Sequence, residues 1–226
     1  MKRTTFFITG TDTGVGKTVL TALLTRYLRE RGINAVALKP ICSGGRDDAR
    51  ELRAAGHGVL ALDEVNPWHF RAPIAPLLAA RRERRRVKLS QVLAHLRAMQ
   101  KRFDVLLIEG AGGLLSPLGE NFDSRSLITS LRAAPIVVCP NRLGAVNQVL
   151  LTLEALPRGA AARARVVLMS PSRPDSSTAA NVNLLGDYFG KKRIFPLPWL
   201  GGRFNLTHGL ENLRVRKALQ GLASAF

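Results

Sequence analysis

Residues 10–18 read Gly10-Thr11-Asp12-Thr13-Gly14-Val15-Gly16-Lys17-Thr18, and this stretch decides the fold. It follows Thr4–Thr9, a short apolar run typical of a buried strand, and precedes Val19–Arg31, whose leucines recur on one helical face. A strand, a glycine-rich loop and a helix in this order are what a phosphate-binding loop requires. Its backbone N–H groups surround phosphate oxygens, and the helix N-terminus adds partial positive charge.

Two residues at the end of this loop have the side chains that phosphate chemistry needs. Lys17 supplies a full positive charge, and the Thr18 hydroxyl is suited to Mg²⁺. The spacing departs from the standard pattern, which has glycine at the place of Thr11, whereas the nearest glycine here is Gly10. A chance glycine turn is the alternative, and the flanking strand and helix argue against it.

Length and composition favour one globular domain across residues 1–226. Hydrophobic residues make up 46% of the chain, and no apolar run is long enough to span a membrane. The apolar run near the N-terminus is too short for a secretory signal, so we expect a cytoplasmic protein. Cys42 and Cys139 are the two cysteines, and we expect both to be reduced.

The formal net charge is +18, from 34 basic and 16 acidic residues, which raises the question of nucleic acid binding. The densest basic cluster is Arg81–Lys88, and it contains no aromatic side chain that could stack on a base. We therefore interpret it as a solvated loop and helix start, and nucleic acid is not an expected partner. A basic surface also attracts anionic nucleotides.

Further apolar runs alternate with amphipathic segments along the rest of the chain. The predicted strands are Ile33–Leu38, Phe103–Ile108, Pro135–Cys139, Arg165–Met169 and Arg193–Leu197. The predicted helices are Asp47–Ala55, Ser90–Arg102, Asp123–Arg132, one ending at Leu156, Asn181–Phe189 and Leu210–Leu222, whereas Gly56–Ala80 is predicted to be irregular. This alternation predicts an α/β fold, with a P-loop NTPase-like parallel β-sheet and helices on both faces.

In such a sheet, ligands bind beyond the carboxyl ends of the strands, where two further residues stand out. Glu109 ends an apolar strand and is followed by Gly-Ala-Gly-Gly, which favours a Mg²⁺ ligand over a surface turn acid. Asp47 and Asp48 could complete an oxygen set with Thr18. Lys39 lies between a strand and Pro40, where a fixed cation could neutralise a phosphoryl group, although a surface lysine is the alternative.

Two cations, a Mg²⁺ set and no nucleophile triad predict phosphoryl transfer by positioning and electrostatics. From the residues alone, the prediction stops at a Mg²⁺-nucleoside triphosphate enzyme that acts on an anionic acceptor.

Several motifs, in order along nearly the whole chain, resemble those of the ATP-dependent dethiobiotin synthetases. The loop at residues 10–18 is similar to that family's variant phosphate loop. The other matching stretches are Lys39–Gly44, Asn66-Pro67 with Phe70, Pro73 and Pro76, Glu109–Gly113 with Ser116–Leu118, Leu143-Gly144 with Asn147, and Pro198-Trp199-Leu200.

The resemblance implies a ligase of biotin biosynthesis that uses 7,8-diaminopelargonate, CO₂ or bicarbonate, and ATP or another nucleoside triphosphate, with Mg²⁺. One amine would take up CO₂ to give a carbamate, which attacks the γ-phosphate to form a carbamic–phosphoric anhydride. The second amine would then close the ureido ring and release phosphate, with ADP as the other product.

The resemblance also implies roles for individual residues. Lys17 and Lys39 would hold the carbamate and γ-phosphate, while Thr13 and Ser43 would orient the carbamate and the diamine. The metal would be held by Thr18, Asp48 and Glu109. The nucleotide would contact Thr13, Gly14, Val15, Gly16, Lys17, Thr18, Glu109, Gly110, Ala111, Gly112, Ser170, Pro198, Trp199 and Leu200. Family members are homodimers, so Leu143–Asn147 would bind the distal carboxylate of the neighbouring subunit's substrate.

One departure from the family and two alternative classes bear on this prediction. Ser170 stands where the family commonly has an asparagine that reads adenine, so the preferred base stays open. A nucleotide switch of the chromosome-partitioning type would need a signature lysine in the loop, where this chain has Asp12. A cobyrinate-type amidoligase would normally need a glutamine-hydrolysing domain, for which 226 residues leave no room.

Overall fold

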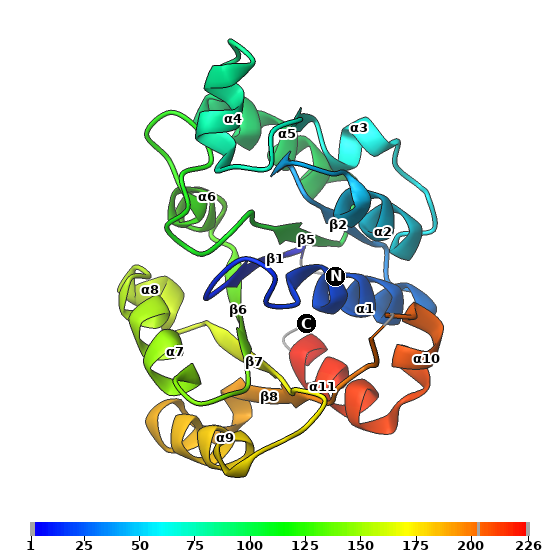
Figure 1. Cartoon of the computed structure of the whole chain (residues 1–226). Coiled ribbons are helices and arrows are strands. Elements are labelled where there is room, and N and C mark those ends of the chain that lie inside the picture. The colour runs from blue at the N-terminus through cyan, green and yellow to red at the C-terminus, as the bar shows by residue number, and fades with distance from the viewer. Residues whose placement is uncertain (1–2, 203, 225–226) are drawn as a thin grey trace.

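A six-stranded parallel sheet forms the centre of the computed structural model, which describes residues 3–202 and 204–224 (Figure 1). Its spatial order is β2-β5-β1-β6-β7-β8, and each neighbouring pair is parallel. The strands are β1 (Thr4–Gly10), β2 (Ala35–Leu38), β5 (Val105–Glu109), β6 (Ala134–Pro140), β7 (Arg165–Met169) and β8 (Ile194–Leu197). The predicted α/β fold with a P-loop NTPase-like sheet is confirmed.

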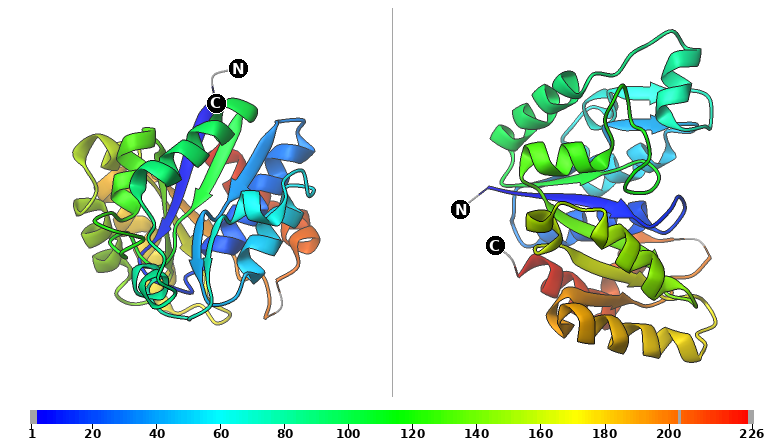
Figure 2. Two further views of the ribbon diagram at one scale, coloured as in Figure 1. Left: turned by 90° about the horizontal axis from the view of Figure 1, so that it is seen from above. Right: turned by 90° about the vertical axis from the view of Figure 1, so that its left-hand side faces the viewer.

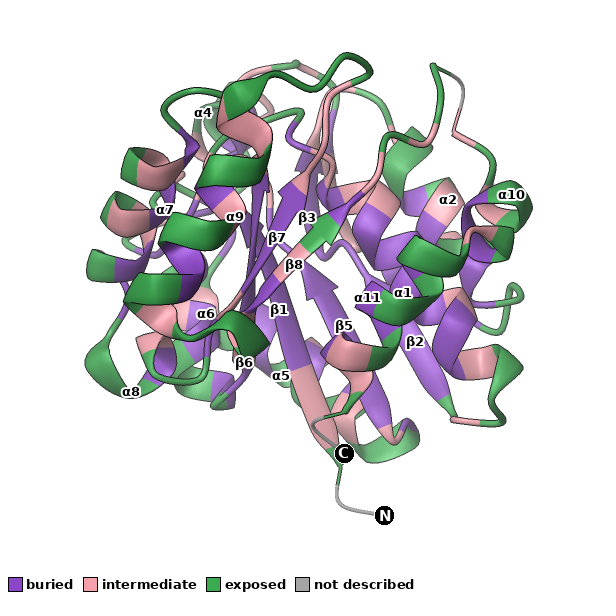
Figure 3. Cartoon of the chain, turned by 90° about the horizontal axis from the view of Figure 1, so that it is seen from below, coloured by how far each residue is buried: buried purple, intermediate pink, exposed green. Residues whose placement is uncertain are grey.

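Helices cover both faces of this sheet. Figure 3 shows α1, α2, α10 and α11 on one side of the buried strands, and α6, α7 and α9 on the other. The helices are α1 (Lys17–Glu30), α2 (Asp47–Ala55), α3 (Leu62–Val65), α4 (Pro76–Arg82), α5 (Leu89–Arg102), α6 (Ser124–Leu131), α7 (Ala145–Glu154), α8 (Arg158–Ala161), α9 (Ser176–Phe189), α10 (Leu206–Glu211) and α11 (Leu213–Ala223), with a 3₁₀ turn at Lys191–Arg193. None of the helices described is long and apolar enough to cross a membrane.

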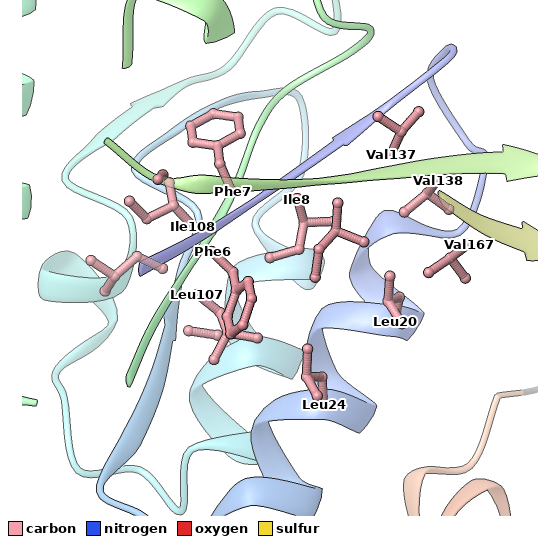
Figure 4. Packing of buried hydrophobic residues seen from close by; sticks show 14 of the residues in the cluster. Phe6, Phe7, Ile8, Leu20, Leu24, Leu107, Ile108, Val137, Val138 and Val167 are labelled. Atoms are coloured by element: carbon pink, nitrogen blue, oxygen red, sulfur yellow. The ribbon is translucent and has the colours of Figure 1, made fainter. Parts of the chain in front are cut away.

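The core is built on β1, whose residues Phe6, Phe7 and Ile8 are fully buried. Successive side chains of a strand point to opposite faces, so a strand covered by helices on both faces is apolar throughout. Figure 4 shows Leu20 and Leu24 of α1 beside this strand. The packing fixes the carboxyl end of β1 against the start of α1, and the two views in Figure 2 show the strands ending at a common edge.

The segment predicted to be irregular, Gly56–Ala80, contains regular structure. Besides α3 and α4, it includes β4 (Trp68–Phe70), which pairs in parallel with β3 (Ile41–Ser43) in a separate two-stranded sheet. The buried side chain of Asn66 explains this, because its Nδ2 donates to the carbonyl oxygen of Lys39 at 2.7 Å. Such a long-range side-chain bond has no periodic signal in the sequence.

The predicted closing helix Leu210–Leu222 is two helices in the structure. Asn212 ends α10 and caps α11, since its side-chain oxygen accepts from the backbone N–H of Arg214 at 3.0 Å. In the same way, Asp175 caps α9, which therefore begins at Ser176 rather than at Asn181. In both places a side-chain cap sets where the helix begins, and the predicted helix boundaries were wrong there.

Replacing Leu24 with alanine should destabilise the fold strongly, because its side chain is fully buried between α1 and the sheet. We expect a loss of about 2–5 kcal/mol in the free energy of unfolding, measured by chemical denaturation. The matched control is Leu213→Ala in α11, where the leucine is 81% exposed. That variant should change stability by no more than about 0.5 kcal/mol, and equal losses in the two variants would contradict this account of the core.

Candidate active site at the phosphate loop

The loop between β1 and α1 turns sharply at two glycines. Gly14 and Gly16 have φ angles of 72° and 97°, in the left-handed region that side chains other than glycine's rarely enter. A Cβ atom on Gly16 would also lie 2.9 Å from the Cε of Met169, at the end of β7. No side chain of the described residues caps the N-terminus of α1, so the N–H groups of its first turn stay available for a ligand, which is the arrangement that suits phosphates.

Lys17 is buried at the start of α1, with its amine turned back onto the loop. Its Nζ donates to the carbonyl oxygen of Asp12 at 2.7 Å. Burial lowers the pKa of Lys17 to about 8, and repulsion from Lys39 adds to this effect, whereas attraction to Glu109 opposes it. The loop backbone therefore holds this side chain in place, in an environment that favours a compensating anion.

Glu109 lies at the carboxyl end of β5, and its side chain links the start of α1 to the end of β2. Its Oε1 accepts hydrogen bonds from the Thr18 hydroxyl and from the Nζ of Lys39, both at 2.8 Å. Lys39 also pairs with Asp48 at the start of α2. Burial alone would lower the pKa of Lys39, but Glu109 and Asp48 outweigh it and the pKa is raised. Lys39 is therefore a permanent cation at this point.

The same residues offer oxygen ligands that suit a divalent cation. Glu109 is buried, and its Oε2 has no hydrogen-bond partner among the residues that the structure describes, which leaves a carboxylate oxygen available beside Thr18 and Asp48. Within the residues described, no three His, Cys, Asp or Glu side chains form a metal-binding group on their own. Two carboxylates and a hydroxyl therefore fit Mg²⁺, which keeps several ligands for water and phosphate, better than a metal that requires a full protein cage.

A cavity of about 620 Å³ brings most of the predicted site residues together. Its lining includes Thr13, Gly14, Gly16, Lys17, Thr18, Lys39, Ser43, Asp48, Glu109, Ala111 and Gly112. Gly110 is not in the lining, because it lies behind the wall, and its N–H donates to the carbonyl oxygen of Ile8 at 2.9 Å. Lys17, Lys39 and Glu109 thus share one cavity, as the strand-end argument predicts.

The lining also contains residues that our sequence reasoning gave no role. Cys42, Glu51, Ala75 and Ser116 all face this cavity. Ser116 accepts a hydrogen bond from the N–H of Gly113 at 2.9 Å and so fixes the glycine turn after β5. The position of Ser116 within the matched motif was a usable signal. A second usable signal was the spacing of Glu51, which lies one helical turn after Asp48 and so shares its helix face.

A second hollow, of about 280 Å³, lies on the other side of the loop glycines. Its lining includes the predicted residues Val15, Ser170, Pro198, Trp199 and Leu200, together with Asn141 and Phe204. The two hollows share Gly14, Gly16 and Val19. The loop therefore forms a wall that both hollows share.

Asn141 lines this second hollow, and both ends of its side-chain amide already make a hydrogen bond. Its Nδ2 donates to the carbonyl oxygen of Thr178 at 2.9 Å, and its Oδ1 accepts from Asn181 at 3.0 Å. Leu143–Asn147, at the start of α7, line neither hollow of their own chain, and Leu143 is 84% exposed. Their predicted contribution to a neighbouring subunit stays a prediction.

Comparisons with known proteins found a matching family model and several similar proteins. Residues 4–202 match a protein-family model described as an AAA domain. The ATP-dependent dethiobiotin synthetase BioD of Anaeromyxobacter dehalogenans (strain 2CP-C) is 39% identical over 198 residues, which cover 85% of this chain and 89% of that protein. The proteins of the same name from Akkermansia muciniphila and Marinobacter nauticus are 40% and 35% identical, covering 67% and 88% of this chain and 71% and 90% of those proteins.

Among solved structures, the signal recognition particle receptor FtsY from Elizabethkingia anophelis aligns with 95% of this chain and 66% of its own, with a TM-score of 0.49 and 16% identity. This resemblance is too remote to indicate function.

Replacing Gly16 with alanine should abolish tight binding of ADP, because the left-handed backbone that directs the loop N–H groups would be strained. We expect at least a tenfold rise in Kd (about 1.4 kcal/mol), measured by calorimetry. Gly32→Ala is the matched control, since Gly32 also has a positive φ, of 75°, but lies at the far end of α1. The control should lose similar stability yet bind ADP normally, and equal loss of binding in both would contradict the assignment.

Proposed function

The chain belongs to the ATP-dependent dethiobiotin synthetase family, and on that premise we propose that it forms dethiobiotin from 7,8-diaminopelargonate, CO₂ and ATP. The observation that carries this proposal is the meeting of Lys17, Lys39 and Glu109 at one cavity beside the phosphate loop. Two cations and a strand-end carboxylate at that place suit the transfer of a phosphoryl group to an anionic acceptor.

The proposed reaction has three bond-forming steps. A neutral amine of the substrate attacks CO₂, a C–N bond forms, and loss of a proton gives a carbamate. A carbamate oxygen then attacks the γ-phosphorus, and the bond to the bridging oxygen breaks so that ADP leaves. Finally, the second amine attacks the carbonyl carbon of the mixed anhydride, loses a proton and expels inorganic phosphate, which closes the ureido ring.

Each step builds or moves negative charge, and the two lysines are placed to stabilise it. Lys39 keeps its charge because Glu109 and Asp48 raise its pKa, so it can neutralise the carbamate oxygen that becomes the nucleophile. Lys17 would exchange its bond to the Asp12 carbonyl for one to a phosphate oxygen. Bound by Thr18, Asp48 and Glu109, Mg²⁺ would supply further positive charge to the phosphate chain.

The remaining predicted residues would position the reactants. Ser43 lies at the end of β3, where its hydroxyl donates to the carbonyl oxygen of Ile74 and so is fixed at the cavity wall. Together with Thr13 it would orient the carbamate and the diamine. In a homodimer, Leu143–Asn147 of the second subunit would offer helix N-terminal amides to the distal carboxylate of the substrate.

A turnover assay tests the proposal directly. Phosphate release should require the diamine, bicarbonate and a nucleoside triphosphate together, and mass spectrometry should find dethiobiotin as the product. A panel of ATP, GTP, CTP and UTP would define the base preference that Ser170 leaves open. If 7,8-diaminopelargonate does not stimulate nucleotide hydrolysis, the proposal is wrong.

Lys39→Gln should reduce kcat by at least about a hundredfold, because a neutral amide cannot stabilise the transferring phosphoryl group. The glutamine can still hydrogen-bond to Glu109, so the circular dichroism spectrum should be unchanged. Lys101→Gln, an exposed lysine on α5, is the matched control and should retain full activity. Normal turnover by Lys39→Gln would remove Lys39 from the mechanism.

A further inference from the structure

The segment Arg81–Lys88 carries more positive charge than its neighbours neutralise. Six of its eight residues are basic, and Glu83 is the only acid among them. Arg81 is paired with Glu120 through two hydrogen bonds of 3.2 and 3.0 Å, and Arg85 with Glu83. Four side chains make no hydrogen bond or ion pair within the part of the chain that the structure describes: those of Arg82, Arg84, Arg86 and Lys88.

Most of this segment is exposed, as expected for a solvated loop and helix start, and its backbone is held in a defined conformation. Arg84 has a φ of 54° and ends α4 in a Schellman motif, in which the N–H of Arg85 donates to the carbonyl oxygen of Ala80 at 2.9 Å. Val87 is only 1% exposed, and its carbonyl oxygen accepts from the N–H of Glu120 at 3.2 Å. The buried anchor and the closed turn fix the backbone from which the charged side chains extend.

Arg85 anchors the segment from the other side. Its guanidinium donates to the carbonyl oxygen of His69 at 2.9 Å and lies over the ring of Phe70, with the guanidinium carbon 4.8 Å from the ring centroid. The segment Arg81–Lys88 therefore packs against β4. It lies at the C-terminal end of α4, and α4 is near the top of Figure 1.

The cations surround a hollow of about 700 Å³ that is separate from both hollows at the phosphate loop. It is lined by Arg81, Arg84, Arg85, Arg86, Lys88, Glu120 and Asn121. We propose that this hollow is a second anion site, which binds a run of several phosphate groups. The site is independent of the proposed ligase reaction, because it shares no lining residue with the catalytic cavity.

Two features favour phosphate runs over other anions. Guanidinium groups match the geometry of phosphate oxygens and bind them in pairs of hydrogen bonds, and a fixed cluster of cations gains most from a ligand with several closely spaced charges. The segment has no aromatic residue, so it would read the phosphates and not the bases of a nucleic acid. Inorganic polyphosphate and a nucleic acid backbone both present this chemistry.

Arg84→Gly gives a sharp test, because glycine is favoured at a positive φ and the variant should fold at least as stably as the wild type. Arg132→Gly is the matched control, since Arg132 also has a positive φ, of 51°, at the end of α6 but does not line the hollow. Both variants lower the net charge equally, and both relieve the same kind of backbone strain. They differ only in whether the lost cation belongs to the hollow.

The measurement is fluorescence anisotropy with labelled inorganic polyphosphate and, separately, a labelled single-stranded DNA 20-mer, at a series of salt concentrations. Saturating ADP is present so that the phosphate loop is filled. For the wild type, log K should fall linearly with log salt concentration. Arg84→Gly should weaken binding about fivefold and lower the slope by about 1, whereas Arg132→Gly should leave both within error.

A triple variant, Arg84→Gly with Arg86→Gln and Lys88→Gln, removes three cations of the lining, and it should weaken binding further and lower the slope by about 3. Binding of the polyphosphate alone, or of both probes with the same sensitivity to Arg84→Gly, supports the site and identifies its source of phosphates. Equal effects of Arg84→Gly and Arg132→Gly would show that only net charge matters, and would overturn the proposal. If the protein binds these anions as described but shows no turnover of the diamine, the second anion site is supported and the proposed ligase function is wrong. The two proposals can therefore fail separately.

Discussion

The ion pair between Lys39 and Glu109 is the interaction on which the candidate site depends. Both groups are almost completely buried, and burying two charges costs free energy unless their geometry is good and their remaining hydrogen bonds are made. The Thr18 hydroxyl and Asp48 supply two of those bonds. The pair also joins the ends of β2 and β5 to the first turn of α1, so the phosphate loop, its helix and the neighbouring strand end hold one another in register.

This pair shows why the site lies where it does. A buried carboxylate with one satisfied oxygen and one unpartnered oxygen is costly in a protein built only for stability. The cost is reasonable where a cation or a substrate group completes the arrangement during function. The two hollows on either side of the loop differ in the same respect. One is lined by charged side chains, and the other by prolines, Met169 and Trp199.

The sheet and the charged centre of the site could be predicted from the sequence, because each rests on a local rule. Fully apolar strands between amphipathic helices are readable as a parallel sheet, and Lys39 and Glu109 each follow such a strand directly. The β3–β4 sheet could not be predicted, since it depends on the long-range bonds of Asn66 within a proline-rich segment. The metal, the second subunit and the roles of the individual site residues stay predictions.

The hydrogen bond from Lys17 to the carbonyl oxygen of Asp12 has a consequence for selectivity. An incoming anion competes with an acceptor already in place, so recognition is an exchange of partners and not the capture of a free cation. An acceptor stronger than a peptide oxygen, such as a charged phosphate oxygen, would gain from that exchange. If Lys17 binds phosphate as proposed, the loop backbone would compete with weaker anions for its amine.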